Sequence, residues 1–265
     1  MPQTKMNDPQ TLKKQYKDSS NLEARIRLHQ RFSVNKYGWQ RWVFDQFKLP
    51  DRCRILELGC GPGYLWMANL DRIPSGWEIT LSDFSAGMLE GTKRNLENQR
   101  PFQYKVIDAL SIPFEDSHFD AVIANHMLYH LADKPAAFSE IRRVLKPAGV
   151  FYASTVGERH LSEMNNLLCK FDEKLVSWGR VSDSFTLENG RTQLAAWFTE
   201  IKLTRYEDAL EVTEAAPLVD YVLSGWARQI LEKRLDQFRQ FVTGEIESRH
   251  GVFHITKDSG LFVAS

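Results

Sequence analysis

The chain lacks the features that mark several large classes of protein. Its 265 residues include three cysteines, Cys53, Cys60 and Cys169, whose spacing fits neither a metal-ligand pattern nor a disulfide framework. The polar N-terminus has no apolar core of a secretory signal, and no apolar run approaches the ~20 residues of a membrane-spanning helix. These absences predict a cytoplasmic protein with no metal site and no membrane partner.

Neither sign of charge is in excess. With 34 basic and 34 acidic side chains, the formal net charge is zero. Nucleic-acid binding depends on a broad positive surface, so the charge balance predicts no nucleic-acid partner. A hydrophobic content of 43% at this length suffices for one large core, or one core and a small lid, and leaves the oligomeric state open.

The most informative stretch runs from Arg54 to Gly63. Its apolar residues between 55 and 58 predict a buried parallel strand, and a helix is expected over Tyr64–Leu70. The glycines between them are Gly59, Gly61 and Gly63. Glycine turns between a strand and a helix bring backbone N–H groups close to a ligand, as open α/β sheets do for nucleotide-like cofactors.

The glycine spacing distinguishes between cofactors. A dinucleotide fingerprint is G-x-G-x-x-G, whereas this loop is G-x-G-x-G with Glu57 two residues before the first glycine. The pattern resembles the cofactor loop of class I S-adenosylmethionine-dependent methyltransferases. The resemblance implies a cofactor contact set of Glu57, Gly59, Cys60, Gly61 and Gly63.

Two further acidic residues stand at predicted strand ends. Asp83 ends the strand over 77–83, and a carboxylate there can accept hydrogen bonds from both ribose hydroxyls, or can merely cap the next helix. Asp108 follows the strand over 102–107 and can bind the adenine amine, or can be a turn residue. In the resembled family these segments hold the nucleoside, which adds Phe84, Met88 and Ala109 to the expected cofactor contacts.

The strand over 119–124 leads into Asn125-His126-Met127-Leu128-Tyr129-His130. This segment lacks the Asn/Asp-Pro-Pro-aromatic motif of enzymes that methylate nucleobase or glutamine nitrogens. It instead resembles that of small-molecule methyltransferases, including those of ubiquinone and menaquinone biosynthesis, so a small-molecule acceptor is expected. Asn125 joins the predicted cofactor contacts. His126 and His130 are candidate general bases, but a packing role is equally open, because transfer from a sulfonium depends mainly on in-line positioning.

The other segments supply the surroundings of this site. Residues 1–50 are expected to form an N-terminal helical cap, in which Tyr16 either covers the methionine end of the cofactor or is an exposed helix-end residue. Residues 51–265 form the predicted methyltransferase domain, with helical insertions at about 156–185 and 214–248 and a shorter helix over 187–198. Near the C-terminus, residues 257–260 are expected to form a turn between two short strands.

The sequence therefore predicts a Rossmann-like α/β fold. The expected sheet has seven mostly parallel strands with an antiparallel last strand, helices on both faces and a helical lid. The resemblance implies methyl transfer from S-adenosylmethionine to a small-molecule metabolite at carbon, nitrogen or oxygen. Two alternatives stay open: a non-catalytic module that binds S-adenosylmethionine, and a nicotinamide-dependent oxidoreductase.

Overall fold

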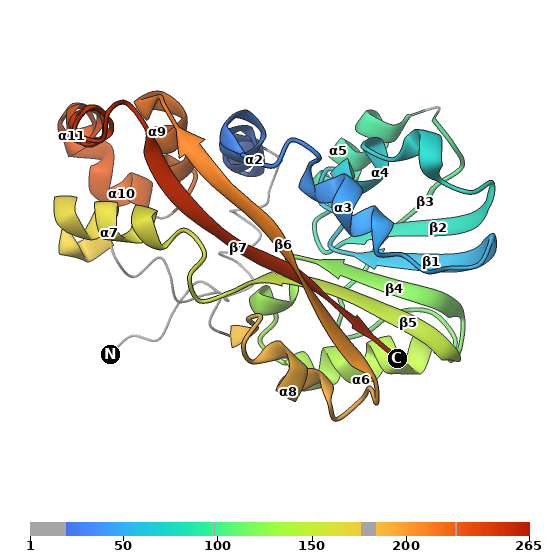
Figure 1. The fold of residues 1–265 in the computed structure, drawn as a ribbon. Coiled ribbons are helices and arrows are strands. Elements are labelled where there is room, and N and C mark those ends of the chain that lie inside the picture. Colours follow the sequence, from blue (N-terminus) through green and yellow to red (C-terminus); the bar gives the residue numbers. More distant parts are fainter. Residues whose placement is uncertain (1–19, 98, 176–183, 226) are drawn as a thin grey trace.

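A computed structural model describes residues 20–97, 99–175, 184–225 and 227–265. Their strands form one seven-stranded sheet in the order β3-β2-β1-β4-β5-β7-β6, in which β7 is antiparallel to both of its neighbours (Figure 1). The strands are β1 (Arg52–Leu58), β2 (Gly76–Asp83), β3 (Gln103–Val106), β4 (Phe119–Asn125), β5 (Leu145–Val156), β6 (Ile201–Val212) and β7 (Phe253–Ala264). The predicted Rossmann-like fold is confirmed.

The helices lie on both faces of the sheet and beyond the far ends of β6 and β7 (Figure 1). They are α2 (Ser20–Phe32), α3 (Trp39–Asp45), α4 (Tyr64–Met67), α5 (Ala86–Leu96), α6 (Lys134–Val144), α7 (Ser162–Phe171), α8 (Gly190–Leu194), α9 (Ala215–Leu223), α10 (Ala227–Leu231) and α11 (Leu235–Glu247). Short 3-10 turns lie at Leu70–Arg72, Leu128–His130 and Glu232–Arg234. Asp133 caps α6, accepting the Ala136 N–H at 3.0 Å.

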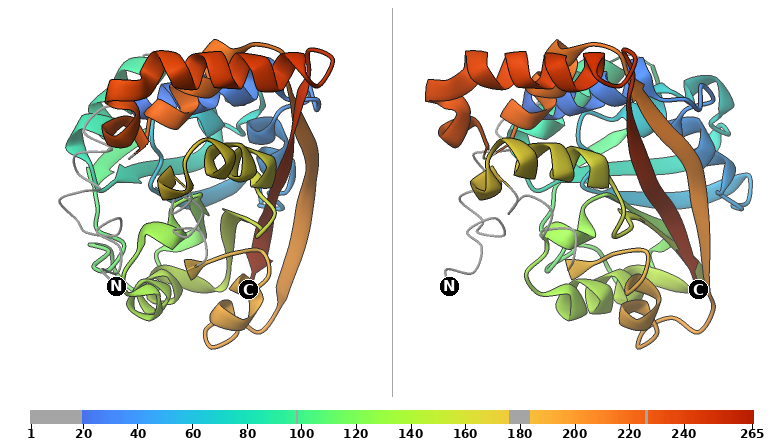
Figure 2. Two further views of the ribbon diagram at one scale, coloured as in Figure 1. Left: turned by 90° about the vertical axis from the view of Figure 1, so that its left-hand side faces the viewer. Right: turned by 60° about the vertical axis from the view of Figure 1, so that its left-hand side comes forward.

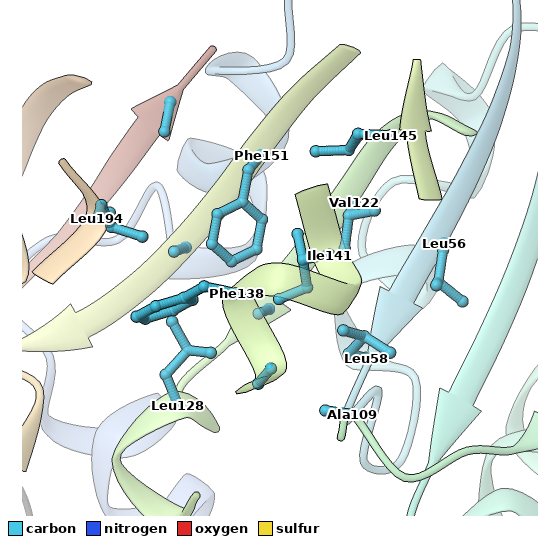
Figure 3. Packing of buried hydrophobic residues seen from close by; sticks show 14 of the residues in the cluster. Leu56, Leu58, Ala109, Val122, Leu128, Phe138, Ile141, Leu145, Phe151 and Leu194 are labelled. Carbon is cyan, nitrogen blue, oxygen red and sulfur yellow. The ribbon is translucent and has the colours of Figure 1, made fainter. Parts of the chain in front are cut away.

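Alternation along the central strands gives each face of the sheet its own core. Leu56 and Leu58 of β1 pack with Val122 of β4 under α6 and α8, while Ile55 and Ile123 face α3, α4 and α5. Figure 3 shows the first of these cores, in which Phe138 and Ile141 of α6 lie against Phe151 of β5. Burial on both faces fixes the register, so the carboxyl ends of the parallel strands meet at one edge.

A third apolar core lies where β6 and β7 extend beyond the sheet, among the helices that Figure 2 shows at that end. It joins the inner faces of α2, α7, α9, α10 and α11, which are far apart in sequence. We call these five helices the helical cluster. By contrast, α3 packs on the sheet itself through Val43 and Phe44. The proposed division into a cap over 1–50 and a domain over 51–265 stays a prediction.

The predicted turn at 257–260 is wrong, because β7 runs unbroken along β6 from residue 253 to 264. Its charged residues are paired within the strand ladder: Lys257 with Asp208, and Asp258 with Arg205. At Gly260 an added Cβ would come within 2.8 Å of the Thr204 carbonyl oxygen, so the glycine permits close strand packing. Turn-like composition therefore reflects ion pairing and close approach here.

Two predicted helices are shorter than expected. Helix α4 ends at Met67 rather than at residue 70, since the Asn69 side chain donates to the Leu65 carbonyl oxygen at 2.7 Å and competes with helix continuation. Helix α8 covers 190–194 of the expected 187–198. The Thr186 hydroxyl accepts the Glu188 and Asn189 N–H groups at 3.2 Å, which holds the preceding residues in a turn.

The helical cluster allows a direct test of its contribution to stability. Phe238 on α11 is fully buried, so Phe238→Ala is expected to lower the free energy of unfolding by about 3–5 kcal/mol. Phe241 on the same helix is only partly buried, so Phe241→Ala should cost about 1–2 kcal/mol. Urea titration measures both, and equal losses would contradict the assignment of Phe238 to this core.

Candidate active site

The glycine loop is fixed by backbone conformation and by its neighbours. Gly59, Gly61 and Gly63 have φ values of 68°, 53° and 80°, a region that favours glycine. At Gly63 an added Cβ would lie 2.9 Å from the Thr92 Cγ2 atom, and at Gly59 it would lie 3.1 Å from the Met127 Cβ atom. The loop therefore has no room for side chains where it meets α5 and the segment after β4.

Asp83 connects this loop to the end of β2. Its Oδ2 atom accepts the Gly61 N–H at 3.1 Å, and its Oδ1 atom accepts the Ser85 N–H at 2.8 Å. Burial raises the pKa of Asp83, and these backbone hydrogen bonds oppose the rise. A carboxylate has about four acceptor positions, so Asp83 keeps capacity for further donors such as hydroxyls.

Asp108 lies at the end of the neighbouring strand, where the Ile107 N–H donates to the Asp83 carbonyl oxygen at 3.2 Å. The Asp108 Oδ1 atom accepts the Leu110 N–H at 3.0 Å, so the turn role is present, while its side chain stays exposed. Ala109 is buried, whereas Phe84 is 43% exposed. The two carboxylates and an accessible aromatic ring thus share one edge, as the sequence predicted.

Glu57 is buried beneath the glycine loop. Its Oε2 atom accepts the Trp66 Nε1–H at 2.6 Å, and its Oε1 atom accepts the Asn125 amide at 3.3 Å. Burial raises the pKa of Glu57 to about 7, although these two hydrogen bonds oppose the rise. The Asn125 Oδ1 atom is buried and has no hydrogen-bond partner among the described residues, which leaves an acceptor free for a ligand.

The remaining predicted cofactor residues have less direct side-chain roles. Met88 is 2% exposed within α5, and Cys60 is buried with its Sγ atom 3.7 Å from the Thr92 hydroxyl. Cys60 instead contributes its backbone, since its N–H donates to the Ser82 carbonyl oxygen at 2.8 Å. Tyr16 lies outside the described residues. Sequence reasoning missed Thr92 and Asn95, which bind the loop carbonyls of Gly61 and Pro62 from α5.

The two candidate bases lie on the segment after β4. His126 has a φ of 50°, unusual for a residue with a side chain, and its N–H donates to the Ser154 carbonyl oxygen at 3.2 Å. Burial and the Lys257 charge lower the pKa of His126 to about 4, and burial and Arg25 do the same for His130. Both imidazoles are therefore neutral at pH 7 and are weak bases.

The raised pKa of Glu57 makes a testable prediction about stability. Between about pH 4.5 and 7 the folded protein retains a proton that the unfolded chain has lost, so the free energy of unfolding falls as pH rises, by about 3 kcal/mol. Glu57→Gln removes this contribution, which appears as a pH-dependent difference between wild type and variant in urea titrations. Glu115→Gln, at an exposed position, is the control; a difference for Glu57→Gln that is constant with pH would contradict the assignment.

No helix among the described residues combines the length and the apolar character needed to cross a membrane.

Comparison with known proteins bears on this geometry. A model described as a methyltransferase domain matches residues 56–153. The chain is 33% identical over 156 residues to the biotin biosynthesis bifunctional protein BioHC of Saccharophagus degradans, covering 58% of this chain and 26% of that protein. It is also 33% identical over 111 residues to the ubiquinone/menaquinone biosynthesis C-methyltransferase UbiE of Desulfotalea psychrophila, covering 42% and 44%. The chain thus spans less than half the length of either relative.

A solved structure shows a similar fold over nearly the whole chain. Phosphoethanolamine N-methyltransferase 2 of Haemonchus contortus, in complex with S-adenosylmethionine, superposes with a TM-score of 0.59 at 20% identity. The match covers 96% of this chain and 59% of that one, and at this identity it supports the fold alone. Residues 56–153 thus match a methyltransferase domain, and the chain has the fold of the class I S-adenosylmethionine-dependent methyltransferases that its motifs resemble.

Proposed function

We propose that the protein transfers a methyl group from S-adenosylmethionine to a small-molecule acceptor. The observation that carries the proposal is the convergence of Glu57, Asp83 and Asp108 around the glycine loop at the carboxyl ends of β1, β2 and β3. In open α/β sheets this edge is where ligands bind.

The residues present fit this cofactor. Asp83 would accept the ribose hydroxyls, Asp108 the adenine amine, and the exposed Phe84 ring would pack on the adenine. The unpartnered Asn125 Oδ1 atom beside the Glu57 carboxyl would accept the methionine ammonium group. When bound, the cofactor supplies a methyl group on a positively charged sulfur, and the chain's own contribution is to hold that methyl in line with an acceptor atom.

His126 and His130 enter as positioning groups in this proposal. Their lowered pKa values make them poor proton acceptors, so an acceptor that is already nucleophilic is favoured. The names of the relatives refer to quinone and biotin biosynthesis, which is in keeping with a small metabolite. A cytoplasmic setting and the absence of a nucleic-acid partner stay predictions.

Calorimetry with S-adenosylhomocysteine tests cofactor binding. Wild-type protein should bind it, and Asp83→Ala should bind at least tenfold more weakly, because both the ribose acceptor and the anchor of Gly61 are lost; one charged hydrogen bond is worth about 1.5–3 kcal/mol. Asp236→Ala, at an exposed site on α11, is the control. No binding by wild type, or unchanged affinity in Asp83→Ala, would refute the proposal.

A methyl-transfer assay separates the enzyme from a non-catalytic cofactor-binding module. Radiolabelled S-adenosylmethionine is incubated with small hydroxy, amino and carboxylate compounds. Transfer to at least one of them is expected for the enzyme, and cofactor binding without any transfer would favour the module. The nicotinamide alternative predicts quenching of reduced-cofactor fluorescence.

A further inference from the structure

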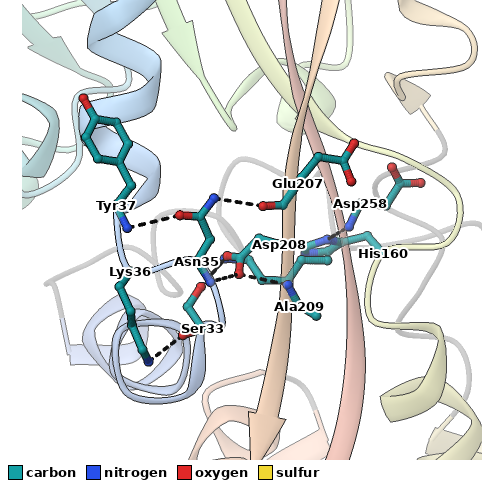
Figure 4. A network of polar contacts seen from close by, with 10 residues as sticks. Ser33, Asn35, Lys36, Tyr37, His160, Glu207, Asp208, Ala209 and Asp258 are labelled. Carbon is teal, nitrogen blue, oxygen red and sulfur yellow. Dashed lines mark hydrogen bonds and ion pairs between the residues drawn. The ribbon is translucent and has the colours of Figure 1, made fainter.

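Helix α2 lies against the cofactor loop. The Cδ2 atom of Leu22, near the start of the helix, is 3.6 Å from the position that a Cβ atom at Gly61 would take. Just beyond the other end of α2, the Asp208 carboxylate on β6 accepts the Asn35 N–H at 2.9 Å and the Ser33 hydroxyl (Figure 4). Both ends of α2 are therefore held, and the side chains between them have defined positions relative to the loop.

Arg25 carries a positive charge that no described carboxylate balances. It lies one helical turn after Leu22, and its Nε and Nη2 atoms donate to the hydroxyl and carbonyl oxygens of Ser224, at the end of α9, at 2.9 and 3.3 Å. Both acceptors are neutral, and in the part of the chain that the structure describes Arg25 forms no ion pair. The guanidinium keeps N–H donors for a further acceptor.

His29 lies one turn beyond Arg25 on the same side of α2. Its ring contacts the rings of His160 and Tyr221, with centroid distances of 6.4 and 5.8 Å. The His29 Nδ1 atom is buried and has no hydrogen-bond partner among the residues that the structure describes. A buried nitrogen without a partner destabilises the protein, and a ligand that binds to it removes this cost.

The electrostatic potential around this part of α2 is positive. Burial lowers the pKa of His29, His126 and His160, and the charge of Lys257 on β7 lowers each of them further. Asp208 pairs with Lys257 but does not offset its effect on these imidazoles. Neutral imidazoles in a positive potential can donate to an anion without carrying a charge themselves.

A second cation acts on the segment after β4. Burial lowers the pKa of His130, and Arg25 lowers it further, while His126 acts in the same way on His29. Arg25 and His29 on α2 thus face His130 and His126 of that segment. Lys257 and Arg25 place positive charge near both of these pairs, and the segment itself contacts the cofactor loop through Met127 and Gly59.

These charges favour a ligand with a single negative charge. Lys257 is already paired with Asp208, so Arg25 is the cation that needs an anion, and a second negative charge on the ligand would stay buried without a partner. A carboxylate carries one charge, and its planar pair of oxygens matches the N–H groups of a guanidinium.

We propose that Arg25 and His29 bind a carboxylate group of the methyl acceptor between α2 and the segment after β4. This inference rests on the proposed function and names its substrate class, a small monocarboxylic acid. The Arg25 guanidinium binds the carboxylate oxygens, and the His29 Nδ1–H donates to one of them. Because α2 also contacts the glycine loop, the acceptor is held beside the cofactor.

Three ligands separate the charge of the head group from its shape. Protein saturated with S-adenosylhomocysteine is titrated by calorimetry at pH 7.5 with hexanoate, hexanamide and pentyl phosphate. Each has an apolar chain that suits the Trp39 and Tyr206 rings beside His126. Hexanoate should bind at least tenfold more tightly than the neutral amide, which has nearly the same shape, and more tightly than the doubly charged phosphate. A smaller preference over the amide, tighter binding of the phosphate, or no binding of any of the three would overturn the proposal.

Matched substitutions on α2 test the role of Arg25. Arg25→Gln should weaken hexanoate binding at least tenfold and keep the affinity for S-adenosylhomocysteine within threefold. Arg25→Lys keeps the charge but not the planar donor group, so it should lose less affinity for hexanoate than Arg25→Gln does. Arg27→Gln removes the same charge from an exposed position on the same helix, and it should change neither affinity.

His29→Phe tests the second residue of the site. It should weaken hexanoate binding and unfold at no lower temperature than wild type, since no protein hydrogen bond to Nδ1 is lost. Unchanged hexanoate affinity in either Arg25→Gln or His29→Phe would overturn the site. So would a tenfold loss of S-adenosylhomocysteine affinity in Arg25→Gln, because Arg25 would then serve the carboxylate of the cofactor.

Failure of this inference is distinguishable from failure of the proposed function. If wild type binds S-adenosylhomocysteine but shows no preference for hexanoate, only the carboxylate site is wrong. If wild type does not bind S-adenosylhomocysteine, the methyltransferase proposal fails first.

Discussion

The attachment of the glycine loop to the ends of β1 and β2 is the constraint on which the site depends. The loop can take its left-handed turns because three of its residues are glycines, and it is held there by the Asp83 carboxylate and the Ser82 carbonyl oxygen. The same carboxylate that fixes the loop is available to a ribose. If Asp83 binds the ribose as we propose, loop geometry and cofactor recognition depend on one side chain.

The sequence alone predicted the strands around the glycine loop and the acidic residues at their ends, for a physical reason. Parallel strands buried on both faces are short apolar runs, and their carboxyl ends meet at one edge. Acidic residues at the ends of such runs, as with Asp83 and Asp108, therefore lie close to one another whatever the length of the segments that connect the strands. Glu57 is likewise an acidic residue near the end of an apolar strand, β1. Its partner Trp66 was not predicted, because a single tryptophan in a short helix gives no pattern that indicates a polar contact.

The tertiary contacts of β6, β7 and the helical cluster could not be predicted, because the residues that contact one another are distant in sequence. Lys257 and Asp258 look like turn residues until their partners Asp208 and Arg205 are known, and those lie on a strand about fifty residues away. The contacts within the helical cluster are also distant in sequence. Helices α2 and α11 each show an amphipathic pattern, but neither pattern indicates that the two helices share a core. His29, His126 and His160 come from three separate segments, so only the fold brings them together.

The polar groups around the glycine loop differ from those beside β6 and β7. On the cofactor side, carboxyl groups accept backbone or side-chain donors and keep further acceptor capacity, which suits a ligand rich in donors and carrying positive charge. Beyond the loop, the buried Lys257 and Asp208 side chains form an ion pair, and burial keeps the His126 and His160 imidazoles uncharged at pH 7. In the proposed reaction the methyl carries the positive charge of the sulfonium to the acceptor. Where the acceptor atom is neutral, that charge leaves the methylated acceptor as a proton taken up by water or a neutral imidazole. Because no protein group has to bond to the methyl during this step, in-line positioning of the acceptor can supply most of the lowering of the barrier.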